Sequence, residues 1–199
     1  MQEARLGTWL RWLRRTATFV YIAALCVAVA VLVIGFIPGS PVTQALPTAL
    51  LSGLDDVKGV VSGVVVDPGG STAFEVSDPS LGQRMIYLAT MLPGLVLVAE
   101  IARRMAKLLR AAQNSDPFTA RTVHDLIVVA KITAAGGLAV WLVATVARWG
   151  LSATMLQSGT APQPDQSILG WFAVGLIFAG FAQLIARGVA MRAELDTVI

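Results

Sequence analysis

The feature that most constrains this chain is a long stretch without charge. Residues 16–54 include no Asp, Glu, Lys or Arg, and residues 17–37 are almost entirely apolar. A helix rises about 1.5 Å per residue, so about 20 apolar residues cross the hydrocarbon core of a bilayer. The stretch therefore predicts a membrane-spanning helix. It is longer than the apolar region of a cleaved signal peptide, which has roughly 7–15 residues, so we expect it to be retained.

Three further apolar runs, at about residues 81–102, 126–147 and 168–186, have the same character. Hydrophobic residues make up 56% of the sequence and charged residues 14%, whereas about 25% of residues are charged in soluble domains. Inside a bilayer the backbone must satisfy its own hydrogen bonds, which a helix does within one segment. We therefore predict an all-α membrane protein, a four-transmembrane-helix bundle in which residues 1–199 form a single integral domain.

Basic residues predict how these four spans are oriented. All Lys and Arg residues except Lys58, Arg84 and Arg148 lie at the amino end, between the second and third spans or at the start of the third, or in the tail. Segments rich in Lys and Arg that flank membrane spans usually stay in the cytoplasm. We therefore predict cytoplasmic termini and a cytoplasmic loop at residues 103–125, with residues 38–80 outside. An even number of spans agrees with this orientation.

The outer loop contains signals for a small sheet. The valine-rich residues 57–66 are followed by Asp67-Pro68-Gly69-Gly70, a sequence typical of a turn. Residues 72–76 favour a second strand. These signals predict an extracytoplasmic β-hairpin between the first two helices.

The cytoplasmic segments predict helical structure next to the bilayer. Residues 3–15 place Leu and Trp at helical spacing among arginines, which favours an amphipathic helix on the inner leaflet. Residues 101–112 predict a basic helix that continues the second span. Asp116 and Pro117 are typical of the start of the next helix, and we expect Phe118 to pack against the base of the bundle. The cations of the basic helix form a candidate partner surface: Arg103, Arg104, Lys107 and Arg110.

Glu100 and Lys131 each lie about a turn or more inside the cytoplasmic end of a predicted span. Intramembrane charges are costly and usually paired, so we hypothesise an ion pair between them. The alternative is that both reach the inner headgroups, or that Glu100 pairs with Arg103 or Arg104 on its own helix. Glycines at 136, 137, 170, 175 and 180 allow helices to approach closely, within one chain or in a homo-oligomer.

The segment Asn114-Ser115-Asp116-Pro117-Phe118-Thr119, with the second and third spans around it, resembles the bacterial family called domain of unknown function 2975. The tail at residues 187–196, a glycine within an alternating basic and acidic stretch, is similar to that family's ending. The resemblance covers roughly residues 81–199. It implies a four-helix bacterial inner-membrane protein without an assigned activity. Some relatives occur beside small helix-turn-helix regulators, which implies a cytoplasmic regulatory protein as a partner.

No motif in the sequence indicates an enzyme. The chain contains no HExxH, GxSxG or GxxxxGK[ST] pattern, and we expect no catalytic residues, cofactor, metal site or direct binding of nucleic acid. We predict a non-enzymatic protein-interaction or sensory component of the cell membrane, with the lipid bilayer around it. The alternative is a small transporter or channel subunit, in which Pro93-Gly94 and Glu100 lie along the path.

Overall fold

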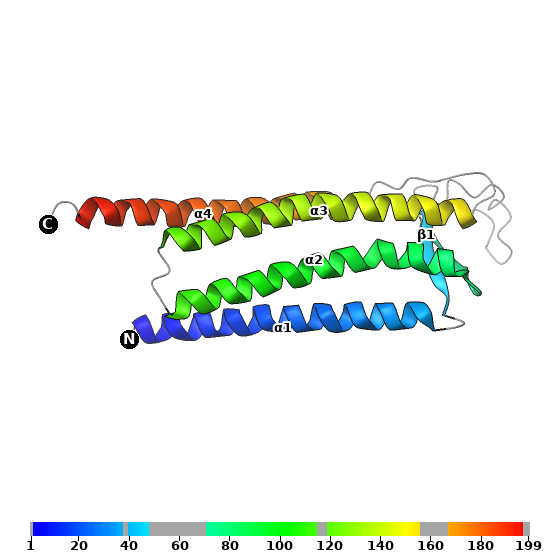
Figure 1. The fold of residues 1–199 in the computed structure, drawn as a ribbon, viewed down its shortest axis with the longest axis horizontal. Helices are drawn as coiled ribbons and strands as arrows, with labels where there is room; N and C mark the ends of the chain where they lie inside the picture. The colour runs from blue at the N-terminus through cyan, green and yellow to red at the C-terminus, as the bar shows by residue number, and fades with distance from the viewer. Residues whose placement is uncertain (1, 38–39, 48–70, 115–118, 156–166, 197–199) are drawn as a thin grey trace, which may run out of the picture. The chain divides into compact units, whose positions relative to one another are not determined.

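The computed structural model describes residues 2–37, 40–47, 71–114, 119–155 and 167–196. Within these ranges the chain forms four helices and two strands (Figure 1). In chain order they are α1 (Gln2–Phe36), β1 (Val42–Pro47), β2 (Ser71–Val76), α2 (Leu81–Asn114), α3 (Ala120–Met155) and α4 (Ser167–Asp196). All four helices are long and apolar enough to cross a membrane. The four predicted helices are thus confirmed, and they indicate a multi-pass membrane protein.

Each helix extends beyond the apolar run that predicts it. The basic residues 101–112 are helical, as expected, because α2 continues to Asn114. Helix α1 begins at Gln2 and runs without a break into the first apolar run. The prediction of a separate helix on the inner leaflet is therefore corrected. No Gly or Pro occurs from residue 8 to residue 34, so nothing local ends the helix at the boundary.

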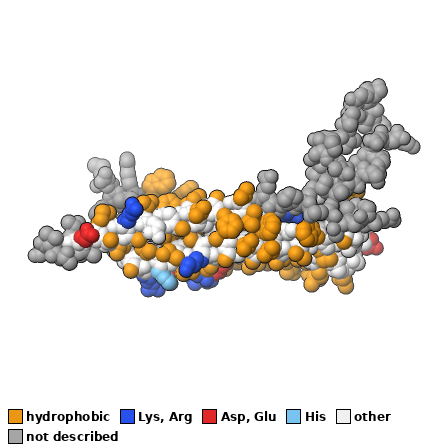
Figure 2. All heavy atoms as spheres, turned by 90° about the horizontal axis from the view of Figure 1, so that it is seen from above, with side chains coloured by type: hydrophobic (Ala, Val, Ile, Leu, Met, Phe, Trp, Pro, Cys, Tyr) orange, Lys and Arg blue, Asp and Glu red, His pale blue; other side chains and the backbone are white. Residues whose placement is uncertain are grey.

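The helices differ in how much of their apolar surface is buried. In the most apolar window of α1 only 6% of the residues are buried, against 28% in α3. Hydrophobic side chains cover much of the visible face of the described residues (Figure 2). Large exposed examples on α1 and α4 are Phe19, Val29, Leu169, Leu176 and Leu184. Such surfaces are stable only when an apolar solvent such as lipid covers them.

Internal contacts divide the chain into two compact units, which are described separately. The first comprises Met1–Ala30, Leu92–Leu142 and Gln166–Ile199. Here small residues of α3 and α4 set the packing distances. A Cβ atom added to Gly137 would lie 2.6 Å from Cγ of Trp171, and one added to Gly136 would lie 2.7 Å from Cδ1 of Leu97. Added to Gly175, it would lie 3.4 Å from the carbonyl oxygen of Ala130.

These glycines confirm the predicted close approach of helices at residues 136, 137 and 175. The same reasoning does not extend along the whole of α4. A Cβ atom added to Gly170 or Gly180 would meet no other atom within 4 Å. The homo-oligomer suggested by this glycine series stays a prediction.

The second unit comprises Val31–Met91 and Val143–Asp165. Its strands β1 and β2 pair antiparallel, with Val42 opposite Val76 and Pro47 opposite Ser71. The predicted second strand at residues 72–76 is confirmed, but its partner is β1. The hairpin within residues 57–76 is therefore corrected, and residues 57–70 lie outside the described residues. Strand β1 follows the end of α1 and β2 precedes the start of α2, so the helix ends rather than a local turn bring the strands together.

Side chains satisfy the free backbone groups at the start of α2 and the end of α1. Ser80 and Gln83 form a capping box, in which the Gln83 amide donates to the Ser80 hydroxyl at 3.3 Å and the Ser80 amide donates to Oε1 of Gln83 at 2.9 Å. The buried Arg84 donates through Nη1 to the carbonyl oxygens of Gly35 at 3.3 Å and Ile37 at 2.6 Å. Its Nε donates to the carbonyl oxygen of Pro79 at 3.2 Å. One guanidinium group thus ties the start of α2 to the end of α1.

Helix α3 follows a threonine N-cap. Its first residue is Ala120, and the Thr119 hydroxyl accepts a hydrogen bond from the Thr122 amide at 3.3 Å. Thr119 is therefore the N-cap, where a hydroxyl oxygen replaces a missing backbone partner. The sequence predicts the start of this helix at Asp116 and Pro117. Both of those residues and Phe118 lie outside the described residues, so their expected roles stay predictions.

Candidate functional site

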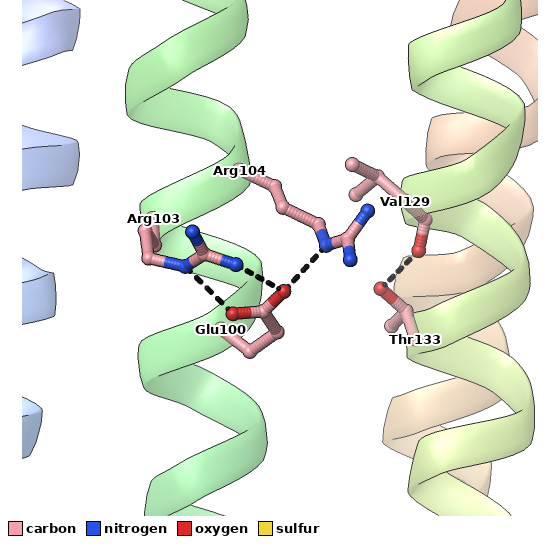
Figure 3. A network of polar contacts seen from close by, with 5 residues as sticks. All are labelled: Glu100, Arg103, Arg104, Val129 and Thr133. Carbon is pink, nitrogen blue, oxygen red and sulfur yellow. Dashed lines mark hydrogen bonds and ion pairs between the residues drawn. The ribbon is translucent and has the colours of Figure 1, made fainter.

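The carboxylate of Glu100 lies between two arginines of its own helix (Figure 3). Arg103 Nε is 2.7 Å from Glu100 Oε2, and Arg104 Nε is 2.6 Å from Glu100 Oε1. Arg103 Nη2 donates a further hydrogen bond to Oε1 at 2.8 Å. Residues three and four positions apart are neighbours on a helix, so this arrangement is local to α2. The structure therefore supports the alternative stated above and corrects the proposed pair with Lys131.

Helical phase explains why Lys131 is not the partner. Leu97 of α2 packs beside Gly136 of α3, and Gly94 of α2 lies beside Val140. These positions define the face of α3 that meets α2. Lys131 is five residues before Gly136, about 140° around the helix, and its side chain is exposed.

A charge-swap experiment tests this correction. Combining Glu100→Lys with Lys131→Glu is expected to restore none of the thermal stability that Glu100→Lys loses, because the two side chains do not interact. Combining Glu100→Arg with Arg104→Glu, which exchanges the charges of an observed pair, is expected to restore part of it. Melting temperatures of the purified protein in detergent provide the measurement. Recovery in the first combination and not in the second would contradict the assignment.

A cavity of about 430 Å³ lies between the end of α2 and the start of α3. Among the described residues, the cationic side chains that line it are Arg103, Arg104, Lys107 and Arg121, and the carboxylate is that of Asp125. Thr119 and Thr122 add hydroxyl groups, whose oxygens are 3.0 Å apart. In Figure 3 Arg104 reaches from α2 toward α3, beside Val129 and the buried Thr133. The cavity therefore has excess positive charge and several hydrogen-bond donors, which suits an anionic group.

A second open groove, of about 450 Å³, lies between α1 and α2. Arg14, Thr18 and Tyr21 of α1 line one side, and the other side is formed by residues of α2, namely Arg103, Ala106, Lys107 and Arg110. The predicted partner surface is thus divided. Arg104 lines the α2–α3 cavity, Arg110 lines the α1–α2 groove, and Arg103 and Lys107 line both.

Sequence reasoning did not assign several residues that the structure brings to these sites. Arg14 and Tyr21 are distant in sequence from the inner loop, and only helix packing brings them beside it. Asp125 and Thr122 lie one turn apart near the start of α3, a spacing that places both on one helix face. The sequence alone shows that Thr122 and Asp125 share a helix face, but not that this face of α3 meets α2.

Comparison with known proteins identifies the family. Searches of curated proteins and of solved structures give no significant match. The model of the family described as "Protein of unknown function (DUF2975)" matches residues 72–199, which include β2 to Val76 and all of α2, α3 and α4. This match includes the inner segment and both sides of the α2–α3 cavity. The chain therefore belongs to the DUF2975 family.

Proposed function

We propose that this protein is a non-enzymatic bacterial inner-membrane component that binds an acidic segment of a cytoplasmic regulatory protein. The observation that carries the proposal is the α2–α3 cavity, where the described lining residues include four cationic side chains and one carboxylate. Carboxylate groups of a partner would complete its charge balance. Arginine presents a planar set of donors that matches a carboxylate in two-point contact.

The cytoplasmic orientation has support in the first unit. Arg14 of α1 and Arg110 of α2 line one groove, which supports a common side of the bilayer for the basic amino end and the basic end of α2. Basic segments beside membrane spans favour the cytoplasmic side. On this orientation, the α2–α3 cavity opens where a soluble protein has access to it.

The four cationic side chains of the α2–α3 cavity are not equally available to a partner. Arg103 and Arg104 are already bound to Glu100. Lys107 and Arg121 are exposed, and no ion pair to either occurs among the residues that the structure describes. A partner carboxylate would therefore contact Lys107 and Arg121 first. Exposed charges of this kind contribute mainly to association rate and specificity, and salt weakens them.

Affinity capture from native bacterial membranes tests the proposal. The tagged protein should recover a cytoplasmic protein with an acidic segment, and recovery should fall about tenfold when Lys107→Gln is combined with Arg121→Gln. Two lost contacts of about 0.7 kcal/mol each, within the range for exposed ion pairs, give this factor. Raising the salt concentration to about 0.5 M should release the same protein, because the Debye length then falls to a few ångströms.

The matched control combines Lys131→Gln with Arg187→Gln, which removes the same charge from exposed positions on α3 and α4 that line neither site. Its recovery should stay within about twofold of the unmodified chain, a difference of about 0.4 kcal/mol. Equal losses in both double variants would show that bulk charge, rather than the cavity, retains the partner. Recovery of an identical set of proteins with the unmodified protein, the double variant and the control variant would contradict the proposal.

A further inference from the structure

The α1–α2 groove has an unbalanced charge that the partner surface does not explain. Its lining includes Arg14, Arg103, Lys107 and Arg110, and none of the described residues that line it carries a carboxylate. Arg103 is bound to Glu100. No ion pair to Arg14, Lys107 or Arg110 occurs among the residues that the structure describes. Three cations therefore face one open groove without an internal counter-ion.

The groove lies at the level where both helices change from apolar to basic. On α1, Arg14 and Arg15 are followed by an apolar run that begins at Ala17. On α2, the apolar run ends at Ala102 and the basic residues begin at Arg103. In a bilayer this change corresponds to the headgroup region, where anionic lipids attract Lys and Arg. Tyr21 adds a phenol, which is also favoured at that depth.

Apolar surface continues from the groove toward the middle of both helices. Val96 lies seven residues before Arg103, on the same face of α2, and is 61% exposed. Leu25 lies seven residues after Thr18, on the same face of α1, and is 41% exposed. Each helix thus presents a polar group at the groove and an exposed apolar side chain two turns away. A soluble anion would use only the first of these features, whereas a phospholipid would use both.

We propose that the α1–α2 groove is a binding site for an anionic phospholipid. Its phosphate group would bind Arg14, Lys107 and Arg110, and its acyl chains would lie along the apolar surface that includes Leu25 and Val96. This proposal goes beyond the partner site proposed at the α2–α3 cavity, because Arg14 and Arg110 do not line that cavity.

Native mass spectrometry of the full chain, released from detergent with defined lipids, tests the proposal. The unmodified chain should retain phosphatidylglycerol, which is anionic, in preference to phosphatidylcholine, which is zwitterionic. Arg14→Gln combined with Arg110→Gln should weaken phosphatidylglycerol retention about thirtyfold, since each basic residue near an anionic lipid contributes on the order of 1 kcal/mol. The double control Lys131→Gln and Arg187→Gln should change it by less than about twofold.

A second variant tests the shape of the groove independently of its charge. Ala106 lines the groove and is half-buried, so Ala106→Leu adds bulk there without changing the net charge. Retention of phosphatidylglycerol should fall in this variant too, while Arg14→Lys with Arg110→Lys should preserve it. These two variants also show that a loss in the glutamine variant is not due to misfolding.

Two results would overturn the inference. Equal phosphatidylglycerol retention in the groove variant and in the double control would show that general surface charge holds the lipid. Complete displacement of the lipid by millimolar inorganic phosphate would show a site for a soluble anion rather than for a phospholipid. Because Lys107 and Arg121 are unchanged in the Arg14 and Arg110 variant, capture of the cytoplasmic partner should persist when lipid retention falls. The lipid and partner proposals can therefore fail separately.

Discussion

Gly137→Ala is expected to lower the free energy of unfolding by about 1–3 kcal/mol, the usual cost of adding atoms to a closely packed contact. The added methyl group would lie 2.6 Å from Cγ of Trp171 on α4. The nearest atom is Cβ of Trp171, which is bonded to the backbone, so rotation of the side chain cannot relieve this contact. Helix α4 must therefore shift. Unfolding of the purified protein in mixed micelles, followed by tryptophan fluorescence, provides the measurement.

Gly180→Ala is the matched control, because it makes the same chemical change on α4 where no atom lies within 4 Å. Alanine favours a helix by about 1 kcal/mol over glycine, so this variant should be as stable as the unmodified chain or more stable. Gly136→Ala should have an intermediate stability, because the added methyl group would contact Cδ1 of Leu97, which is the movable end of a side chain. If Gly137→Ala and Gly180→Ala unfold alike, the α3–α4 contact described here is wrong.

Arg84→Met is expected to cost about 2–4 kcal/mol of stability. The change keeps an unbranched side chain but removes the donors to the carbonyl oxygens of Gly35, Ile37 and Pro79. Hydrogen bonds to charged groups contribute about 1.5–3 kcal/mol each, and a buried carbonyl left without a donor adds a penalty. The last carbonyls of a helix have no partner within it, so α1 loses the group that satisfies its end.

Two further variants define the source of that loss. Arg84→Lys should recover only part of the stability, because an ammonium group cannot reproduce the planar set of donors. Lys131→Met removes a charge at an exposed position and should change stability by less than about 0.5 kcal/mol. Equal unfolding of Arg84→Met and Lys131→Met would show that the three carbonyl contacts do not stabilise the fold.

The helices could be predicted from the sequence because their signal is local and strong. An apolar run of bilayer length can satisfy its backbone only as a helix, and α2 keeps its helical form even through Pro93. Residues 72–76 were likewise predicted as a strand. Their partner was not, because Asp67-Pro68-Gly69-Gly70 favours a local turn while the observed pairing depends on the ends of α1 and α2.

The candidate site shows the same division between local and long-range information. The cations Arg103, Arg104, Lys107 and Arg110 are evident in the sequence, and the Glu100 pairs follow from spacing within one helix. The place of Arg14 beside Arg110 depends on which faces of α1 and α2 meet. The orientation of Lys131 likewise depends on which face of α3 meets α2. Helical phase between separate segments is a property of packing, and a single sequence of largely interchangeable aliphatic residues specifies it weakly.

The low burial of α1 has a consequence for how this protein can change during evolution. Only 6% of the residues in its most apolar window are buried. Most exchanges among Val, Ile, Leu and Phe there therefore alter a surface that needs only to be apolar. Apart from the groove residues Arg14, Thr18 and Tyr21, the structure therefore constrains α1 mainly in its length and its apolar character. The match to the family begins at residue 72, after α1, whose apolar window is the least buried of the four helices.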